Sequence, residues 1–313
     1  MKKKQVKIDE CFVVKEDVEK KGRFKILEKK NLYESLGISL ETLKKKKLTT
    51  IVVIGSGGKT TTIDTLAREF LALGKKVVIT TTTHMYIPKQ NGVLYYEPNE
   101  NEKEALESKD SFYYNNQICY DKETFLKKVD DTLKRDCIVV VGSMKKEMLK
   151  ESALPKISAI EKTLLTILQE QADILLVEAD GSKGFPLKFP NEQEPVWLET
   201  MDVIVQCIGL QALYQPVHKV CHRYKLACEH CQIKETDRVT KEMLVCILQE
   251  GYMKKQPIKQ RSHTSYNIFL TNRKGAMMSK KMAIEIGCFL KENILCDNLA
   301  MVQISKEETN QYV

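Results

Sequence analysis

The segment IVVIGSGGKTTT at residues 51–62 restricts the fold of this chain more than any other. An apolar, β-branched run predicts a buried strand over residues 51–54, and three glycines separate it from a helix predicted to start at Lys59. Glycines let the backbone approach phosphate oxygens, the amides and positive dipole end of a helix favour an anion, and lysine adds a mobile positive charge. The residues of this predicted phosphate-binding loop are Gly55, Ser56, Gly57, Gly58, Lys59, Thr60 and Thr61.

The loop is a shortened form of the general pattern G-x-x-x-x-G-K-[ST]. Gly58, Lys59 and Thr60 match that pattern, whereas Val53 occupies its first glycine position. We expect Lys59 to neutralise the β- and γ-phosphates and the Thr60 hydroxyl to complete a Mg²⁺ shell. The alternative is a glycine-rich turn that only packs a strand against a helix, but such a turn needs no lysine and no paired threonines. The motif therefore predicts binding of a nucleoside triphosphate with magnesium.

Short β-rich apolar runs alternate with helical patterns after the loop, which is typical of a parallel sheet covered by helices. We predict an α/β fold that is P-loop-like, with a mostly parallel sheet flanked by helices. Residues 1–47 are interpreted as a basic N-terminal extension, and residues 48–313 as the α/β domain with a helical insertion at 211–262. The expected strands are residues 51–54, 76–81, 137–141, 174–178, 203–207, 267–270 and 299–304.

Composition and charge narrow the class of protein. The chain is 42% hydrophobic and 29% charged, which allows a sizeable core. Its apolar runs are too short to cross a bilayer and its amino terminus has no signal-like apolar stretch, so we expect no membrane contact, a cytoplasmic location and reduced thiols. Residues 1–47 carry 15 Lys and Arg against 8 Asp and Glu, and the remainder carries 35 against 34. This nearly neutral main body argues against a nucleic-acid-binding surface.

Polar side chains also follow two later predicted strands, where ligands of open α/β sheets bind. Hydroxyls of the run Thr80 to Thr83, with Thr81 and Thr82 as the main candidates, followed by His84, are candidates to orient magnesium, its waters or the terminal phosphate. An exposed β-branched strand end is an equally good interpretation. In the segment ILLVEADGSKG, Asp180 is the stronger candidate for a magnesium ligand, and Glu178 is a candidate to orient a water or act as a base. The alternative for Asp180 is a plain turn with the following glycine.

Basic residues follow this acidic pair. Ser182, Lys183 and Lys188 are candidates to hold an anionic substrate or a phosphate, with a solvated loop as the alternative. His222 and Arg223 are further candidates to face an anion, although a role on a helix surface explains them as well.

Cysteines and histidines crowd into residues 218–231, where thiolate and imidazole could bind zinc or handle a softer group. Cys228 and Cys231 form the only C-x-x-C pair of this segment, whereas zinc sites usually offer two separate ligand pairs. Buried thiols with incidental histidines are the default interpretation.

In combination, these motifs resemble the YqeC family, accessory proteins associated with selenium-dependent molybdenum hydroxylases. The resemblance covers most of residues 31–290. It depends on GSGGKTT (55–61), TTTTH (80–84), VEADGSKGFPLKFP (177–190), EP (194–195) and HR (222–223). It implies a nucleotide-binding protein that helps to make or insert the selenium-containing molybdenum cofactor, with the hydroxylase or a cofactor-handling protein as partner and the molybdenum cofactor as a possible substrate.

One departure from the family concerns the nucleotide base. Family members tend to carry an asparagine-lysine pair similar to the base-reading element of GTPases, whereas this chain reads LTNRKGA, with Asn272 retained and Arg273 in place of the lysine. Guanine selectivity therefore does not follow, and both ATP and GTP remain candidates.

We expect a magnesium-dependent maturation factor in which Lys59, Glu178 and Asp180 act on the nucleotide, as an NTP hydrolase or a nucleotidyl or phosphoryl transferase. A nucleotide-gated chaperone or binding protein without turnover is the alternative. A carboxylate-activating ligase is the third candidate, since the loop also looks like the GTNGKTT type of Mur ligases.

Overall fold

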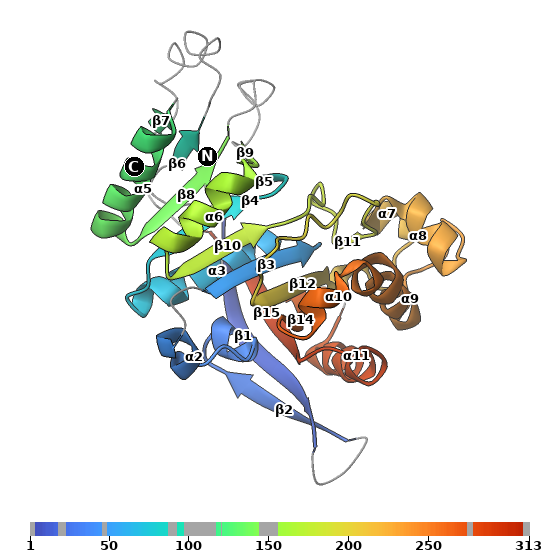
Figure 1. Cartoon of the computed structure of the whole chain (residues 1–313). Helices are drawn as coiled ribbons and strands as arrows, with labels where there is room; N and C mark the ends of the chain where they lie inside the picture. Colours follow the sequence, from blue (N-terminus) through green and yellow to red (C-terminus); the bar gives the residue numbers. More distant parts are fainter. Residues whose placement is uncertain are drawn as a thin grey trace.

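A computed structural model describes residues 4–17, 23–45, 49–86, 93–96, 117–119, 121–143, 156–273 and 278–308. It confirms the α/β class, because an eleven-stranded and mostly parallel sheet carries helices on both faces (Figure 1). The strands of this sheet are β1 (Lys4–Glu16), β2 (Phe24–Lys29), β3 (Thr49–Gly55), β4 (Val77–Thr81), β6 (Val93–Tyr96), β7 (Gln117–Cys119), β8 (Ile138–Gly142), β10 (Ile174–Glu178), β12 (Val203–Gly209), β14 (Ser265–Arg273) and β15 (Asn298–Glu308). Each strand predicted from the sequence is among them.

Within the described residues, two smaller sheets of two strands each accompany the main one. They pair β5 (His84–Tyr86) with β9 (Lys156–Ser158), and β11 (Leu187–Lys188) with β13 (Cys221–His222). The helices are α1 (Leu32–Ser35), α2 (Leu40–Lys45), α3 (Lys59–Ala72), α5 (Lys122–Asp136), α6 (Lys162–Gln171), η4 (Leu210–Ala212), α7 (Val217–Val220), α8 (Tyr224–Cys231), α9 (Lys241–Cys246), η5 (Ile247–Tyr252), η6 (Met253–Lys255), α10 (Ile258–Arg261) and α11 (Lys280–Asn293). None of the described helices is long and apolar enough to cross a membrane.

The order of the strands puts β3 inside the sheet. That order is β2-β1-β15-β14-β12-β3-β10-β4-β8-β6-β7, and every described pairing from β15 to β7 is parallel. From β3 the chain crosses to β4 on one side, and after β10 it crosses to β12 on the other side. The carboxyl ends of the parallel strands therefore share one edge, and the order reverses beside β3, which is where open α/β sheets bind their ligands.

The alternating side chains of β3 join two cores, one on each face of the sheet. Ile51 and Val53 belong to the core that also contains the apolar residues of α1, α2 and α3. Val52 and Ile54 belong to the opposite core, with α5, α6, α9 and α11. Since both faces are covered, the strand is apolar throughout, as expected for a central parallel strand. This packing holds the start of the following loop rigidly.

Residues 1–47 are expected to form a basic N-terminal extension, and two described strands of this segment, β1 and β2, belong to the main sheet. β1 pairs antiparallel with both β15 and β2. Residues 11–14 are buried, and the backbone amides of Leu32 and Tyr33 donate to the Glu69 carboxylate of α3 at 2.8 and 3.0 Å. The basic composition of this segment does not indicate that it pairs with the sheet, because a lysine such as Lys15 is exposed while the apolar residues before it are buried.

The chain between β12 and β14 folds into short helices that gather at one end of the sheet, in orange and yellow in Figure 1. Cys231 of α8 and Cys246 of α9 form a disulfide across this helical segment. The expectation of reduced thiols is therefore wrong for this pair, because two short helices bring the sulfurs together across 15 residues of sequence.

Candidate functional site

The glycine loop (residues 55–61) leaves the carboxyl end of β3 and enters α3. Gly55, Gly57 and Gly58 have φ angles of 87°, 79° and 124°, which side chains other than glycine rarely adopt. A Cβ atom at Gly57 would lie 2.6 Å from the backbone nitrogen of Gly209 at the end of β12. The loop therefore needs glycine both for its conformation and for its close packing against the neighbouring strand end.

Polar contacts fasten the glycine loop to three neighbouring segments. The Ser56 amide donates to the Cys207 carbonyl at 2.9 Å, and the Ser56 hydroxyl donates to the Phe185 carbonyl. The Thr271 hydroxyl of β14 donates to the Gly57 carbonyl at 2.6 Å. Ser56, predicted to contact phosphate, thus has its side chain engaged with the loop that follows β10.

Lys59 begins α3 and turns its ammonium group into the protein. Its side chain is only 4% exposed. The Nζ atom donates to the Gly55 carbonyl at 2.7 Å and lies 3.3 Å from Oδ1 of Asp180 and 3.8 Å from Oε1 of Glu178. The structure therefore brings together the lysine and both carboxylates that the sequence singled out, at the strand-end edge beside β3.

Asp180 is the most enclosed of these groups, and its Oδ2 atom is surrounded by donors. Oδ2 accepts the Gly55 amide at 3.0 Å and the Tyr252 hydroxyl at 3.3 Å, and Lys188 Nζ also lies 3.3 Å away. Oδ1 has no hydrogen-bond partner among the described residues, although Lys59 is nearby. Asp180 thus holds the start of the glycine loop with one oxygen and keeps the other toward the lysine.

Glu178 ends β10 beside the same lysine. Burial raises the pKa of Glu178 to about 7, against the opposing effect of the Lys59 ammonium and with a further contribution from the Asp180 charge. Burial lowers the pKa of Lys59, but the Asp180 and Glu178 carboxylates outweigh it, so that this pKa is raised overall. Lys59 therefore stays charged, and its two acidic neighbours hold that charge in a buried setting.

A chain of buried charges leads away from Asp180. Lys188 of β11 is fully buried and lies between Asp180 and Glu194, with its Nζ 2.8 Å from Oε2 of Glu194. Arg223 forms an ion pair with the same Glu194 oxygen and is 27% exposed. Burial opposes ionisation of Glu194, but Lys188 and Arg223 hold its pKa below the ordinary value. Three cations and three carboxylates thus alternate from Glu178 and Lys59 to the surface at Arg223.

The threonines after β4 lie next to Glu178, because β4 pairs with β10 and Thr81 is opposite Glu178. The Thr81 hydroxyl donates to the Glu178 carbonyl at 2.8 Å, and the Thr82 amide donates to the same carbonyl at 3.0 Å. Among the described residues, the buried hydroxyls of Thr80, Thr82 and Thr83 have no hydrogen-bond partner, and neither has Oε2 of Glu178. Buried polar atoms are normally satisfied, so this cluster is suited to a polar ligand.

Other predicted residues lie further from Lys59. His84 is exposed in β5, which pairs with β9. Lys183 is exposed on the turn after β10, where the Ser182 carbonyl accepts the Phe185 amide at 3.0 Å. His84 and Lys183 are therefore not part of the buried centre formed by Lys59, Glu178 and Asp180.

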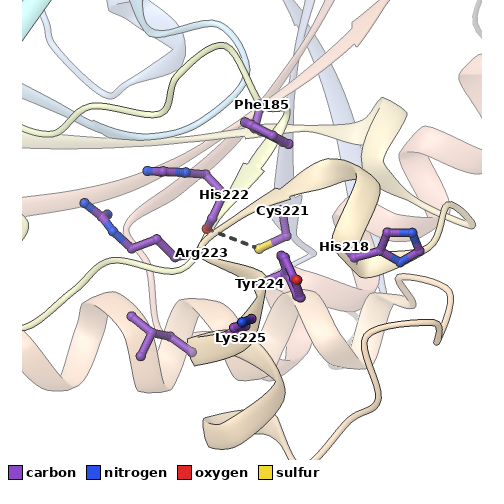
Figure 2. A pocket seen from close by; sticks show the side chains of 8 residues that line it. Phe185, His218, Cys221, His222, Arg223, Tyr224 and Lys225 are labelled. Atoms are coloured by element: carbon purple, nitrogen blue, oxygen red, sulfur yellow. Dashed lines mark hydrogen bonds between the residues drawn. The ribbon is translucent and has the colours of Figure 1, made fainter.

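The cysteines and histidines of residues 218–231 do not converge. Within the described part of the chain, no group of three or more His, Cys, Asp or Glu side chains is arranged to hold a metal ion. Cys231 is bonded to Cys246, and His218 contacts the Glu235 carbonyl at 2.8 Å. Figure 2 shows His218 extending to one side and His222 to the other. The metal interpretation of the segment is therefore not supported.

A surface pocket of about 450 Å³ opens in the same segment, walled by Phe185, His218 and the run from Cys221 to Leu226 (Figure 2). The rings of Phe185 and His222 stack with their centroids 5.9 Å apart. Burial, then the charge of Arg223 and of two nearby lysines, lowers the pKa of His222 to about 4. His222 is thus a neutral ring in positively charged surroundings.

The family model described as "YqeC protein" matches residues 51–225, more than half of the chain. The chain belongs to the YqeC family. A YqeC relative, "Uncharacterized protein YqeC" of Escherichia coli (strain K12), is 27% identical over 146 residues, which are 46% of this chain and 45% of that protein. The match thus spans about half the length of the curated relative. No solved structure matches the chain. The YqeC match includes the glycine loop, both carboxylates and the charge chain as far as Arg223.

Sequence reasoning missed several residues of this centre. Tyr252 lies 72 positions after Asp180 and comes from the helical segment, where no local motif marks it. Thr271 follows directly after the strand predicted over residues 267–270, and no sequence motif marks its hydroxyl. Glu194 lies in the EP family motif, which by itself does not indicate an ion pair with Lys188.

Proposed function

We propose that this chain is a magnesium-dependent nucleoside-triphosphate-binding protein. The observation that carries the proposal is the meeting of Lys59 with Glu178 and Asp180 at the reversal point of the sheet, directly beside a glycine loop. A glycine loop at a helix start offers backbone amides and a positive dipole end to phosphate, and Lys59 adds the charge that phosphate oxygens require. The ion pairs of Lys59 with Glu178 and Asp180 hold its ammonium group next to the glycine loop.

The donor set also fits a magnesium ion. Magnesium in such sites takes one or two carboxylates, hydroxyls, waters and phosphate oxygens. Oδ1 of Asp180 and Oε2 of Glu178 lack hydrogen-bond partners among the described residues, as do the hydroxyls of Thr80, Thr82 and Thr83. The Thr60 hydroxyl interacts with Glu178 from the start of α3. Thr60 and Asp180 would hold the ion, which would neutralise phosphate charge, while the threonines at the end of β4 would orient its waters.

The reaction that we propose is hydrolysis of the nucleotide or transfer of a phosphoryl or nucleotidyl group. Glu178 is placed to orient the attacking group, because its Oε2 atom has no other hydrogen-bond partner among the described residues and the carboxylate lies next to the lysine. We further propose that this reaction serves maturation or insertion of the selenium-containing molybdenum cofactor of a hydroxylase. Family membership supports that role, and the molybdenum cofactor is then a candidate substrate.

Titration of the purified chain with ATP, GTP and CTP, each with and without Mg²⁺, tests nucleotide binding. We expect magnesium-dependent binding of at least one nucleotide, and Lys59→Ala should weaken it by about tenfold or more because charge-assisted bonds to phosphate are lost. Lys122→Ala is the matched control, since Lys122 also begins a helix but is exposed. Lys59→Gln provides a second variant, with urea unfolding to verify its fold. Weak binding of all three nucleotides that does not depend on Mg²⁺ or Lys59 would refute the proposal.

A turnover assay separates an enzyme from a nucleotide-gated chaperone. We expect the wild-type chain to release phosphate or pyrophosphate in the presence of the hydroxylase and its cofactor, and Glu178→Gln to bind nucleotide without turnover. Binding with no turnover under any of these conditions would favour the chaperone. For the cellular role, the hydroxylase made without this chain should contain molybdenum but less selenium than the same enzyme made with it. An unchanged selenium content would contradict that part of the proposal.

A further inference from the structure

The pocket beside residues 221–226 is physically tied to the glycine loop. Phe185 forms one wall of the pocket with its ring, and its carbonyl accepts the Ser56 hydroxyl. The next carbonyl, that of Pro186, accepts the Gly209 amide at 2.9 Å, and Gly209 packs against Gly57. One short segment therefore lines the pocket on one side and supports the predicted phosphate site on the other.

A second link between the two places is ionic. Arg223, in the pocket wall, is joined through Glu194 and Lys188 to Asp180. The two bridging residues are largely buried, with side-chain exposures of 12% and 0%, so solvent screens this chain of charges weakly. An anion bound at Arg223 therefore changes the electrostatic potential along these ion pairs as far as Asp180, which contacts the glycine loop.

The walls of the pocket define the chemistry of a ligand. Phe185, His222 and Tyr224 supply aromatic surface, which favours a flat ring. Arg223 and Lys225 supply positive charge in the pocket wall. The charges of Lys183 and Lys188 also lower the pKa of His222, whereas the charge of Glu194 raises it. A guanidinium carries five N–H donors, and the contact with Glu194 uses Nη1, so Arg223 retains donors for a second anion.

The backbone of Arg223 has an unusual conformation that fixes where its side chain begins. Its φ and ψ are 60° and 45°, a left-handed conformation that is rare for residues other than glycine, and it separates β13 from α8. Pairing of β13 with β11 places it: Leu187 is opposite Cys221, and Lys188 is opposite His222. Strained backbone of this kind occurs preferentially at ligand sites. Figure 2 shows the Arg223 and His222 side chains extending together to the same side.

From these contacts we infer that the pocket binds a second small ligand, an aromatic or heteroaromatic ring that bears a carboxylate or phosphate, next to the nucleotide. The inference rests on the proposed function for the identity of its neighbour, but the binding of the ring itself does not require nucleotide. The ring stacks within the aromatic walls, and the anionic group pairs with Arg223. Its place beside the glycine loop makes the ligand a reaction partner of the nucleotide or the cargo whose presence the nucleotide site senses.

Three small probes separate the two halves of this inference. 2-Naphthoate has both a flat ring and an anionic group, 2-naphthylmethanol has the ring alone, and cyclohexanecarboxylate has the anion alone. Dissociation constants are measured on the full chain by ligand-detected NMR titration. We expect 2-naphthoate to bind about fivefold or more tightly than either of the others, because it gains both the ring contacts and the charge pair. Absence of 2-naphthoate binding, or equal binding of all three probes, would overturn the inference.

Variants locate the binding. Tyr224→Leu and Arg223→Gln should each weaken 2-naphthoate binding by about fivefold, whereas Tyr86→Leu and Arg68→Gln, which change exposed residues far along the chain, should not. Tyr224→Leu leaves the charge chain intact, so it tests the pocket independently of any effect on Glu194. If the two pocket variants bind 2-naphthoate like wild type, the site is wrong.

Lys59→Ala keeps the two proposals apart. We expect it to lose nucleotide binding and to retain 2-naphthoate binding. If nucleotide binding never depended on Lys59 while 2-naphthoate still bound in the pocket, the proposed function would fail and the pocket would stand. Loss of 2-naphthoate binding in folded Lys59→Ala would place the probe at the phosphate site and would contradict the pocket.

Discussion

Two regions of this chain are rich in chemically active side chains, and the fold treats them in opposite ways. Glu178 and Asp180 are far from Lys59 in the sequence, yet the three meet within hydrogen-bond or ion-pair distance. The cysteines and histidines of residues 218–231 are close in the sequence, yet among the described residues they form no metal-holding group, and Cys231 is bonded to Cys246. Proximity in sequence is therefore a poor guide to a site. Adjacent parallel strands align their carboxyl ends, whereas short helices distribute their side chains over all sides.

Removal of a charge from the buried chain should have the largest effect on stability. Lys188→Met leaves Asp180 and Glu194 without their shared cation, and breaking a buried ionic cluster on one side typically costs about 3–5 kcal/mol. Equilibrium unfolding in urea measures the free energy of unfolding. Lys225→Met, an exposed lysine of the Cys/His segment, should change it by less than about 0.5 kcal/mol. Similar effects of the two variants would erase the contrast between the regions.

Loss of the disulfide should affect the helical segment without weakening nucleotide binding. A bond that closes a loop of about 15 residues stabilises a protein by about 3 kcal/mol in the chain-entropy description. We expect reduction of the wild type, or Cys231→Ser, to lower the free energy of unfolding by about 2–3 kcal/mol. Reducing agent should then have no further effect on Cys231→Ser. If Cys231→Ser instead abolished stoichiometric zinc binding by the wild type, the segment would be a metal site after all.

Glycine substitutions probe the loop itself. Gly57→Ala would place a Cβ atom 2.6 Å from backbone atoms of Gly209, in addition to its unfavourable φ of 79°. Gly184 has a similar φ of 80°, but a Cβ atom there meets nothing within 4 Å. We expect Gly57→Ala to cost about 1–3 kcal/mol and to weaken nucleotide binding, and Gly184→Ala to cost about 1 kcal/mol and to leave binding unchanged. Equal losses of binding in the two variants would show that close packing at the loop is unimportant.

The smallest effect concerns pH. His222 has a pKa of about 4 in the folded chain against an ordinary value of 6.5, so the unfolded chain binds more protons between these values. The contribution of His222 to stability should therefore rise with pH across that window, and the penalty from His222 should be absent above it. Unfolding midpoints in urea at several pH values, compared with those of His222→Asn, isolate this contribution. A difference between the two proteins that does not change from pH 4 to 6.5 would contradict the shifted pKa.

Much of the architecture follows from local patterns. Apolar runs of the right length predicted the main strands, because a strand buried on both faces has to be apolar throughout. The N-terminal strands were missed because the exposed Lys15 directly follows the apolar stretch of β1 at residues 11–14, and because the partner strand β15 lies about 300 residues away. Composition alone does not reveal such a pairing.

In the site, too, local patterns predict some residues, whereas contacts between distant segments are not predicted. Gly55 to Lys59 could be recognised because the glycines, the lysine and the helix start lie in one continuous segment. Glu178 and Asp180 were found because they follow a clear strand. Tyr252, which donates to Asp180, could not be found, since only the packing of the helical segment brings it there.

The sequence by itself determined the class of fold, the glycine loop and the carboxylates that end β10, because each depends on a few consecutive residues and on the regular period of a strand or helix. Only the tertiary structure decided that Lys188, Glu194 and Arg223 continue the charges of this centre to a pocket, and that the cysteines and histidines do not form a comparable cluster. The physical reason is that ion pairs and ligand sites require side chains to converge in space, and the order of strands and the packing of short helices control that convergence.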